Sequence, residues 1–274
     1  MDEHDKPSLL ALYKRHPLTE NALLRRLTDR AGLLTEFDLA IDRESELTDQ
    51  NHIGGFRSTI ALAELAEVNR DDRVIDMGCG LGGPARVLAS IYGCSVHGVD
   101  LNPQRIRQAQ SLSARVGLRH LVSFEVNDIQ HCAGESRYSL LWAQNSWTHF
   151  ADPQLFAVVA AELLAPRARV AFEDVCLTRE CVNQSERNSL ERLSELWSCH
   201  LRPPEHWLAG IKGAGFTRVV WEDARVAMIA YLERISRMVV SPTNEVPESE
   251  IEGWRLGLDL ARTGLISYVR FAGS

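Results

Sequence analysis

The sequence contains no long hydrophobic run. Its N-terminus, residues 1–6, is polar and acidic and lacks the apolar core of a signal peptide. No later segment approaches the roughly 20 apolar residues that a membrane-spanning helix requires. We therefore expect a cytoplasmic protein without a stable membrane association.

Basic residues are in the minority. The chain has 30 Lys and Arg residues against 37 Asp and Glu residues, which gives a formal net charge of -7 at pH 7. No run rich in Lys or Arg offsets this balance. Nucleic-acid-binding proteins present basic surfaces to the phosphates, so the composition argues against nucleic acid as a partner.

Cysteines are few and irregularly spaced. The chain has 6 of them, several within apolar strand or helix patterns, which is typical of reduced, buried thiols. One group of potential metal ligands matches no common zinc spacing, so we expect no metal site. This group consists of Cys176, Cys181, Cys199, His200 and His206.

The 274 residues do contain an alternating series of apolar strand and helix patterns. Such alternation predicts an α/β fold with parallel strands joined by crossover helices. Strands are expected at 73–77, 95–99, 121–126, 138–144, 168–175, 216–222 and 266–271. Helices are expected at 56–68, 83–92, 103–116, 153–164 and 205–214.

Further helical segments lie outside this alternation. Residues 8–31 read as two helices, the second capped by Thr19 and ended by Gly32, and residues 35–52 read as a loop. Additional helices are expected at 179–198, 225–238 and 248–263. We expect an N-terminal helical cap and lid segment (1–55), a main domain (56–274), and substrate-side inserts at about 176–205 and 225–263.

A glycine-rich segment follows the first expected strand. Gly78, Gly80 and Gly83 form the pattern G-x-G-x-x-G between strand 73–77 and helix 83–92. Glycines there let a ligand approach the bare backbone at the carboxyl end of the strand. Asp100 ends the second strand, where an acid can hold a ribose diol. These residues predict a nucleoside ligand but do not choose among nucleosides.

Asp76, just before the glycines, favours a cationic ligand. A pyrophosphate at the helix N-terminus would be repelled by a neighbouring carboxylate. S-adenosylmethionine instead carries an ammonium, a sulfonium and an adenosine. Asn127 and Asp128 follow the third strand, where a carboxylate can accept the adenine amine; the alternative for Asp128 is a helix N-cap.

At these residues the chain resembles a known family. Val74 to Gly83 (VIDMGCGLGG) resembles motif I of the class I S-adenosylmethionine-dependent methyltransferases, and Asp100 with Asn127-Asp128 matches their ribose and adenine positions. Residues 49–55 and 142–149 resemble the small-molecule group that includes the sarcosine/dimethylglycine, tocopherol and cyclopropane-synthase-like enzymes.

The resemblance implies a Rossmann-like fold. We expect a seven-stranded, mostly parallel sheet with its last strand antiparallel, helices on both faces, a helical cap, and inserts after strands five and six. The main domain would bind S-adenosylmethionine. The implied cofactor contacts are Asp76, Gly78, Cys79, Gly80, Asp100, Leu101, Asn127, Asp128, Ile129, Gln144, His52 and Gly54.

Catalytic and substrate contacts are expected after strands four and five. His149 is the candidate base, because histidine titrates near neutral pH; the alternatives are a helix cap or packing against Trp147. Glu173 is the second catalytic candidate, although Glu173 and Asp174 point to opposite faces and at most one faces the cleft. The expected substrate contacts are Asn145, Trp147, His149 and Trp197.

Two residues leave alternatives open. In the resembled group an acid commonly stands at the position of Asn145. Because this chain has an amide there, it is open whether the substrate contact of that group is inherited at this position. Arg86 is either a contact to the cofactor carboxylate or a structural residue.

The resulting hypothesis is methyl transfer to a nitrogen or oxygen of a small molecule, a metabolite or a natural product of secondary metabolism, leaving S-adenosylhomocysteine. Three alternatives stay open. They are a cyclopropane-synthase-like or carbon methyltransferase acting on a lipid or isoprenoid, a non-catalytic S-adenosylmethionine-binding module, and an NAD-dependent oxidoreductase. We expect a homodimer formed through the helical inserts.

Overall fold

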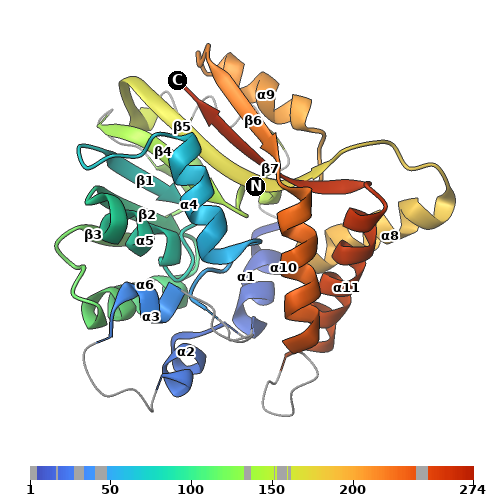
Figure 1. Ribbon diagram of the computed structural model, residues 1–274, viewed down its shortest axis with the longest axis horizontal. Helices are drawn as coiled ribbons and strands as arrows, with labels where there is room; N and C mark the ends of the chain where they lie inside the picture. Colours follow the sequence, from blue (N-terminus) through green and yellow to red (C-terminus); the bar gives the residue numbers. More distant parts are fainter. Residues whose placement is uncertain are drawn as a thin grey trace.

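The computed structural model describes residues 5–16, 18–27, 34–40, 48–132, 137–150, 152, 159, 162–238 and 246–274. Seven strands form one sheet in the order β3-β2-β1-β4-β5-β7-β6 (Figure 1). All neighbouring strands are parallel except β7, which runs antiparallel to both β5 and β6. The expected sheet is confirmed. Its strands are β1 (Arg73–Met77), β2 (Ser95–Asp100), β3 (Val122–Val126), β4 (Tyr138–Gln144), β5 (Leu164–Leu177), β6 (Val219–Asp223) and β7 (Ile266–Gly273).

Helices cover both faces because successive strand residues point to opposite sides. Leu140 and Trp142 of β4 face α4 (Gly55–Leu65), α5 (Gly83–Tyr92) and α6 (Pro103–Arg115). Leu141 and Ala143 face the other core, which contains Trp207 of α9 (Pro204–Gly213). The strand order reverses between β1 and β4, and in such sheets a crevice opens there at the carboxyl ends.

The N-terminal part differs in detail from the expectation. Helices α1 (Asp5–Arg15) and α2 (Glu20–Arg26) are present, and the Thr19 hydroxyl caps α2 by accepting from the backbone N–H of Ala22. A short helix, α3 (Glu36–Ala40), lies within the expected loop, because Asp38 accepts from the N–H and hydroxyl of Thr35 at its start. The expected helix end at Gly32 lies outside the described residues.

Strand boundaries shift in the second half of the chain. β5 begins at Leu164, before the expected residue 168, and continues to Leu177, while β6 begins only at Val219. The longer β5 pairs with both β4 and β7, and its pairing with β4 shifts register between Leu164 and Arg169, where Arg167 has φ +64°. Most of the expected helix 153–164 lies outside the described residues.

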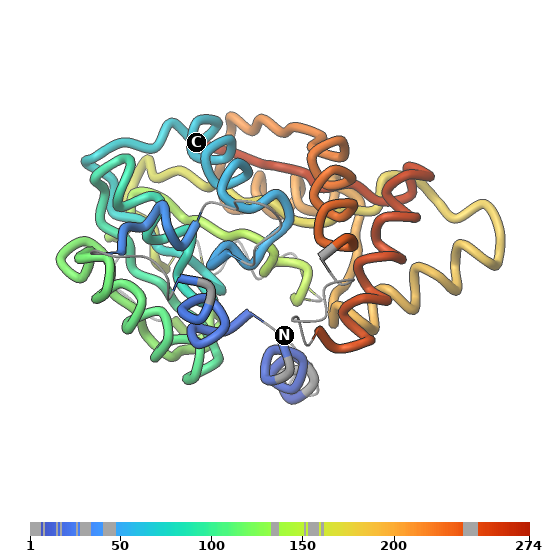
Figure 2. Tube along the Cα trace, turned by 60° about the horizontal axis from the view of Figure 1, so that its bottom comes forward, coloured from blue at the N-terminus to red at the C-terminus, as the bar shows by residue number. Residues whose placement is uncertain are grey.

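The helices after β5 and β6 form a separate layer. Helices α8 (Gln184–Trp197), α10 (Arg225–Met238) and α11 (Glu248–Arg262) share one apolar core. Trp197 approaches α11 at two glycines, since a Cβ on Gly253 or Gly257 would lie 2.7 or 2.6 Å from its ring. Figures 1 and 2 show α1 between α10–α11 and the α3–α6 side of the molecule. Among the described helices, none is long and apolar enough to cross a membrane.

A buried ion cluster joins the N-terminal part to the sheet domain. The Arg86 side chain is fully buried; its Nε lies 2.9 Å from Glu36 Oε2 and its Nη2 lies 2.6 Å from Asp49 Oδ2. Its Nη1 donates to the carbonyl oxygen of Leu81 at 2.8 Å and to the Ser113 hydroxyl at 3.2 Å. Arg86 is therefore a structural residue, which resolves the alternative left open by the sequence.

Replacing Arg86 tests this cluster. Arg86→Met leaves two buried carboxylates without their counterion, so we expect a loss of about 3–5 kcal/mol in the free energy of unfolding. Urea denaturation measures the change. Arg115→Met is the matched control, since Arg115 pairs with Glu20 at 3.3 Å while half exposed, and should cost less than about 1 kcal/mol. Equal losses in the two variants would contradict a special role for Arg86.

Candidate functional site

The glycine turn at the carboxyl end of β1 has a backbone that only glycine adopts easily. Gly78 has φ +77° and Gly80 has φ +54°, both in the left-handed region. A Cβ on Gly78 would lie 2.5 Å from the Cβ of Ser146. The N–H of Gly80 donates to Asp100 Oδ2 at 2.9 Å, which ties the turn to the end of β2. The turn therefore presents bare backbone beside a carboxylate.

A first cavity, the strand-end cavity, lies beside this turn. It measures about 560 Å³ and gathers residues that follow β1, β2 and β3. Asp100 also accepts from the backbone N–H of Asn102 at 2.8 Å, and burial raises the pKa of its carboxyl. The predicted contacts that line this cavity are Gly78, Asp100, Leu101, Asn127, Ile129, Asn145 and His149, together with Leu9, Leu10 and Tyr13 of α1.

Asp128 does not line the strand-end cavity. Its carboxylate accepts from the backbone N–H of Gln130 at 3.0 Å and caps the short helix η1 (Ile129–His131). The structure thus contains the N-cap that the sequence offered as the alternative. An adenine contact by Asp128 stays a prediction.

Asp76 lies beneath the glycine turn within β1. Its side chain is buried, and Oδ2 has no hydrogen-bond partner in the part of the chain that the structure describes. Burial, together with the charge of Asp100, raises the pKa of Asp76 to about 8. A cation nearby would stabilise the ionised form, whereas the protein alone favours the neutral acid.

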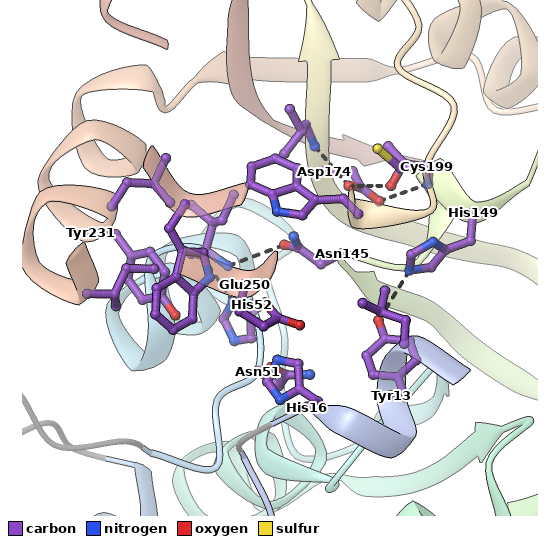
Figure 3. A pocket seen from close by; sticks show the side chains of 18 residues that line it. Tyr13, His16, Asn51, His52, Asn145, His149, Asp174, Cys199, Tyr231 and Glu250 are labelled. Atoms are coloured by element: carbon purple, nitrogen blue, oxygen red, sulfur yellow. Dashed lines mark hydrogen bonds between the residues drawn. The ribbon is translucent and has the colours of Figure 1, made fainter. Parts of the chain in front are cut away.

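A second cavity, the insert cavity, lies under the helical layer. It measures about 750 Å³ and is drawn in Figure 3. The apolar part of its wall comes mainly from α1, α8, α10 and α11 and consists of Leu12, Ile53, Val175, Trp197, Tyr231, Leu232, Ile235 and Trp254. Its polar part comprises Tyr13, His16, Asn51, His52, Asn145, Thr148, His149, Asp174, Cys199 and Glu250.

Three residues line both cavities: Tyr13, Asn145 and His149. The Tyr13 hydroxyl lies 3.2 Å from His149 Nε2, and His149 Nδ1 lies 2.8 Å from the carbonyl oxygen of Ser198 (Figure 3). Because that carbonyl only accepts, Nδ1 carries the proton and Nε2 accepts from Tyr13. Burial lowers the pKa of His149, which keeps the ring neutral.

Asn145 is held in an unusual conformation at this junction. It has φ +52°, and its side-chain oxygen accepts from the backbone N–H of Ile53 at 3.3 Å and from the Tyr268 hydroxyl. An amide oxygen therefore stands where the resembled group commonly has an acid. The side-chain nitrogen is the remaining group with which Asn145 can contact a ligand.

Of the two adjacent acids within β5, the structure places Asp174 on the insert cavity and Glu173 in the interior. Glu173 accepts from the Ser58 hydroxyl at 2.8 Å, Gln144 Nε2 at 2.6 Å and Arg270 Nε at 2.7 Å. Its oxygens are used by these partners and it lines neither cavity, and a catalytic role for Glu173 stays a prediction. Burial raises the pKa of Asp174 to about 6.

His52 and Gln144 belong to a buried network that adjoins the site. His52 Nε2 lies 3.1 Å from the Thr59 hydroxyl, and its Nδ1 lies 3.3 Å from Gln144 Nε2. Burial lowers the pKa of His52 to about 4. Gln144 Oε1 accepts from Trp142 Nε1 at 3.1 Å. Gly54, with φ +84°, caps α4 and lines neither cavity.

The two tryptophans expected to contact substrate have different positions. Trp147 is 2% exposed and packs against Phe150, Phe172 and Trp207, so it belongs to the core and lines neither cavity. A substrate contact by Trp147 stays a prediction. Trp197 does line the insert cavity.

A smaller recess, the glycine-turn recess, contains a residue that the sequence analysis missed. It is lined by Cys79, Gly80, Asp100, Asn51 and Tyr13, among others, and by Arg105 of α6. Arg105 is buried, and neither terminal nitrogen has a hydrogen-bond partner within the described ranges. Its guanidinium lies 4.4 Å above the Tyr13 ring. In the sequence it looked like an ordinary helix-surface arginine.

The potential metal ligands are not assembled. In the described part of the chain, no group of three or more His, Cys, Asp or Glu side chains is arranged to hold a metal ion. All 6 cysteines are free, and all but Cys181 are buried.

Comparison with known proteins identifies the kind of domain. Residues 68–215, just over half of the chain, match the family model described as a methyltransferase domain. A probable chloroplastic tocopherol O-methyltransferase of Oryza sativa subsp. japonica is 32% identical over 130 residues, 45% of this chain and 36% of that protein. A glycine/sarcosine/dimethylglycine N-methyltransferase of Actinopolyspora halophila is 24% identical over 219 residues, 78% of this chain and 37% of that protein.

Solved structures share the fold. A putative sarcosine dimethylglycine methyltransferase from Galdieria sulphuraria superimposes with a TM-score of 0.69 at 18% identity, covering 79% of this chain and 84% of that chain. The chain spans little more than a third of the length of the two curated relatives above.

The buried acid Asp76 gives a pH-dependent prediction. Its pKa is raised from 3.8 to about 8 on folding, so the unfolded chain releases the proton first. The free energy of unfolding therefore falls by up to roughly 1.4 kcal/mol per pH unit between about pH 4 and pH 8. Asp76→Asn has no carboxyl to titrate, so it should lose this fall with pH and be more stable than the wild type at pH 7.5.

Urea denaturation between pH 5 and pH 8 measures the difference between variant and wild type. Asp71→Asn, at an exposed carboxylate, is the control and should leave the pH dependence unchanged. A difference between Asp76→Asn and wild type that does not grow with pH would contradict the raised pKa.

Proposed function

The chain belongs to the methyltransferase-domain family, and we propose that it transfers the methyl group of S-adenosylmethionine to a nitrogen or oxygen of a small molecule, leaving S-adenosylhomocysteine. The observation that carries this proposal is the shared wall of the two cavities at Tyr13, Asn145 and His149. A cofactor on the glycine-turn side and an acceptor on the insert side would meet there.

The residues around the glycine turn fit this cofactor. Its methionine part is zwitterionic, and the turn has a buried acid, Asp76, and a buried guanidinium, Arg105, each with an atom that lacks a hydrogen-bond partner in the described chain. Arg105 would hold the carboxylate and Asp76 would favour the ammonium. Asp100, at the end of β2, would bind the ribose hydroxyls. Gly78 and Gly80 leave room for the ligand along the backbone.

The chemistry needs alignment more than strong acid–base groups. Bound S-adenosylmethionine supplies a methyl group on a positively charged sulfur. The acceptor atom would attack the methyl carbon in line with the carbon–sulfur bond, and the sulfur would leave. An acceptor N–H or O–H must also lose a proton, and His149 Nε2 is the neutral acceptor at the junction. The Ser198 carbonyl fixes the His149 tautomer, and the Tyr13 hydroxyl bonds Nε2. A methyl acceptor would either replace the Tyr13 hydroxyl at Nε2 or pass its proton to Nε2 through that hydroxyl.

The proposal extends to the domain organisation, the acceptor and the assembly. Residues 1–55 act as a cap, because Tyr13, Asn51 and His52 contribute walls to the site, and residues 56–274 form the S-adenosylmethionine-binding domain. The acceptor is a metabolite or natural product of secondary metabolism, and the enzyme acts in the cytoplasm as a homodimer formed through its inserts. The large apolar wall of the insert cavity favours such an acceptor over a very small one.

Ligand-induced stabilisation tests the cofactor class. S-adenosylmethionine and S-adenosylhomocysteine should raise the melting temperature, and NAD should leave it unchanged, because only a ligand that binds the folded state stabilises it. Asp100→Ala and Arg105→Met should each weaken S-adenosylhomocysteine binding about 10- to 100-fold, the value of a hydrogen bond to a charged group. Calorimetric titration measures this affinity.

Arg107→Met is the matched control for the cofactor contacts, since Arg107 lies on the same helix but is exposed. The affinity of Arg107→Met for S-adenosylhomocysteine should equal that of the wild type. Stabilisation by NAD alone would overturn the proposal, and unchanged affinity in Asp100→Ala would remove the ribose contact from it.

The junction residue His149 should affect turnover rather than cofactor binding. With an acceptor that the wild type methylates, His149→Ala should lower kcat about 10²- to 10⁴-fold, the usual effect of losing a general base. The S-adenosylhomocysteine affinity should stay within about twofold, because the acid–base step is not part of cofactor binding. His120→Ala, at an exposed histidine, is the control. A normal kcat in His149→Ala would exclude it as the proton acceptor.

A further inference from the structure

Two glycines of α11 bring the Trp197 ring into direct contact with the helix. Gly253 and Gly257 are four residues apart and therefore share one face of α11. A Cβ on Gly253 would lie 2.7 Å from Trp197 Nε1, and a Cβ on Gly257 would lie 2.6 Å from Trp197 Cη2. Both distances are shorter than a van der Waals contact, so an edge of the indole occupies the space where two side chains of α11 would otherwise lie.

The backbone of α11 does not require glycine at these positions. Both residues lie inside a helix of 15 residues, and neither has a positive φ. Glycine within a helix is less favourable than alanine, so alanine would suit both positions if nothing lay against them. The space taken by the Trp197 ring is therefore the physical reason for glycine on this face.

Trp197 connects this face of α11 to the acceptor side of the proposed site. The ring is half-buried and lines the insert cavity. Trp197 is the last residue of α8, and the carbonyl oxygen of the next residue, Ser198, lies 2.8 Å from His149 Nδ1. The indole and the group that holds the imidazole thus belong to adjacent residues. A ligand between the indole and the imidazole therefore meets a space of defined length.

The packing behind Trp197 leaves the insert cavity as the space into which the indole can move. Leu193 of α8 and Leu232 of α10 are buried in the apolar core against which Trp197 packs. A Cβ on Gly257 would also lie 3.6 Å from Leu232 Cδ1. Because protein cores are close-packed, a side chain added on this face of α11 would push the indole toward the cavity.

We propose that Gly253 and Gly257 are specificity-determining residues, because they set the position of the Trp197 ring. That ring in turn sets the size of the acceptor that fits between it and His149. The inference rests on the proposed function and assigns a shape class to its acceptor, a molecule with a flat apolar ring system that lies against the indole.

The neighbouring wall suits such a ring system. Trp254, the residue after Gly253, lines the same cavity, as does Tyr231 of α10. Figure 3 shows Tyr231 on the side opposite His149. Aromatic side chains bury a large apolar area and prefer offset-stacked or edge-to-face contacts with other rings, so this end of the cavity favours an aromatic group over a small polar one.

Two neutral hydroxyarenes test the assignment: 2-naphthol, with two fused rings, and 9-phenanthrol, with three. Fluorescence titration measures the affinity of each, with and without saturating S-adenosylhomocysteine. Gly257→Ala should lower the affinity for 2-naphthol about 10-fold or more, because the displaced indole overpacks the cavity. Trp197→Ala should raise the ratio of 9-phenanthrol to 2-naphthol affinity about fivefold or more, because it removes the wall. Binding of neither arene by the wild type, or an unchanged 2-naphthol affinity in Gly257→Ala, overturns the inference.

A double variant connects the effect of Gly257 to the indole. In the Trp197→Ala background, Gly257→Ala should change the 2-naphthol affinity less than about twofold, because the ring that the new methyl group displaces is absent. Arg255→Ala, at an exposed residue of the same helix, is the control and should bind both arenes like the wild type. An equal loss with and without the indole would mean that the glycines serve helix packing alone. Gly253→Ala takes the place of Gly257→Ala if the latter does not fold.

The cofactor affinity separates the two levels of proposal. Trp197, Gly253 and Gly257 line neither the strand-end cavity nor the glycine-turn recess, so each variant should bind S-adenosylhomocysteine within about twofold of the wild type. If the wild type fails to bind S-adenosylhomocysteine, the proposed function fails, whereas the titrations without it still report the size selectivity of the cavity. If S-adenosylhomocysteine binds but the selectivity does not follow the indole, only the acceptor class fails.

Discussion

The buried guanidinium of Arg86 is the interaction on which the site depends. A charge without water is stable in the interior only when its hydrogen-bonding groups are matched, and here the matching groups come from two separate segments, Glu36 of α3 and Asp49 before α4. Arg86 itself belongs to α5, which starts at the glycine turn. The N-terminal segment must therefore be in place for α5 to be buried as it is, and the same segment supplies Asn51 and His52 to the site. The placement of the N-terminal segment and that of α5 are energetically coupled through this one side chain.

The parts of the fold that were predicted from sequence are those determined by local patterns. β1, β4 and α5 lie at their expected bounds, because apolar periodicity and glycine conformation are properties of short segments. The position of Asp100 at the end of a strand was predicted for the same reason, since it ends an apolar run beside the glycine turn. The side chains that face the cavities were less predictable. Glu173 and Asp174 are adjacent and both acidic, and only the packing of β5 between β4 and β7 decides which one is paired with Arg270.

Contacts between distant segments left no signal in the sequence. Tyr13 and His149 are 136 positions apart and meet only because α1 packs beside the strand ends. Trp147 illustrates the reverse case, since its position after β4 suggested a substrate contact, whereas the core formed with Phe172 and Trp207 buries its ring. Arg105 was missed because its burial depends on Tyr13, which covers its guanidinium from another part of the chain.

Tyr13 lies between the glycine-turn recess and the insert cavity and lines both. On the glycine-turn side lies a buried guanidinium, Arg105, and on the insert side lie the acids Asp174 and Glu250. The Tyr13 ring contacts the cation with its face, while its hydroxyl bonds His149 at the junction. The single phenol that stands between the two walls also bonds the imidazole. Because burial lowers the pKa of that imidazole and the Ser198 carbonyl fixes its tautomer, His149 presents a neutral ring, with Nε2 as its hydrogen-bond acceptor, where the two cavities join.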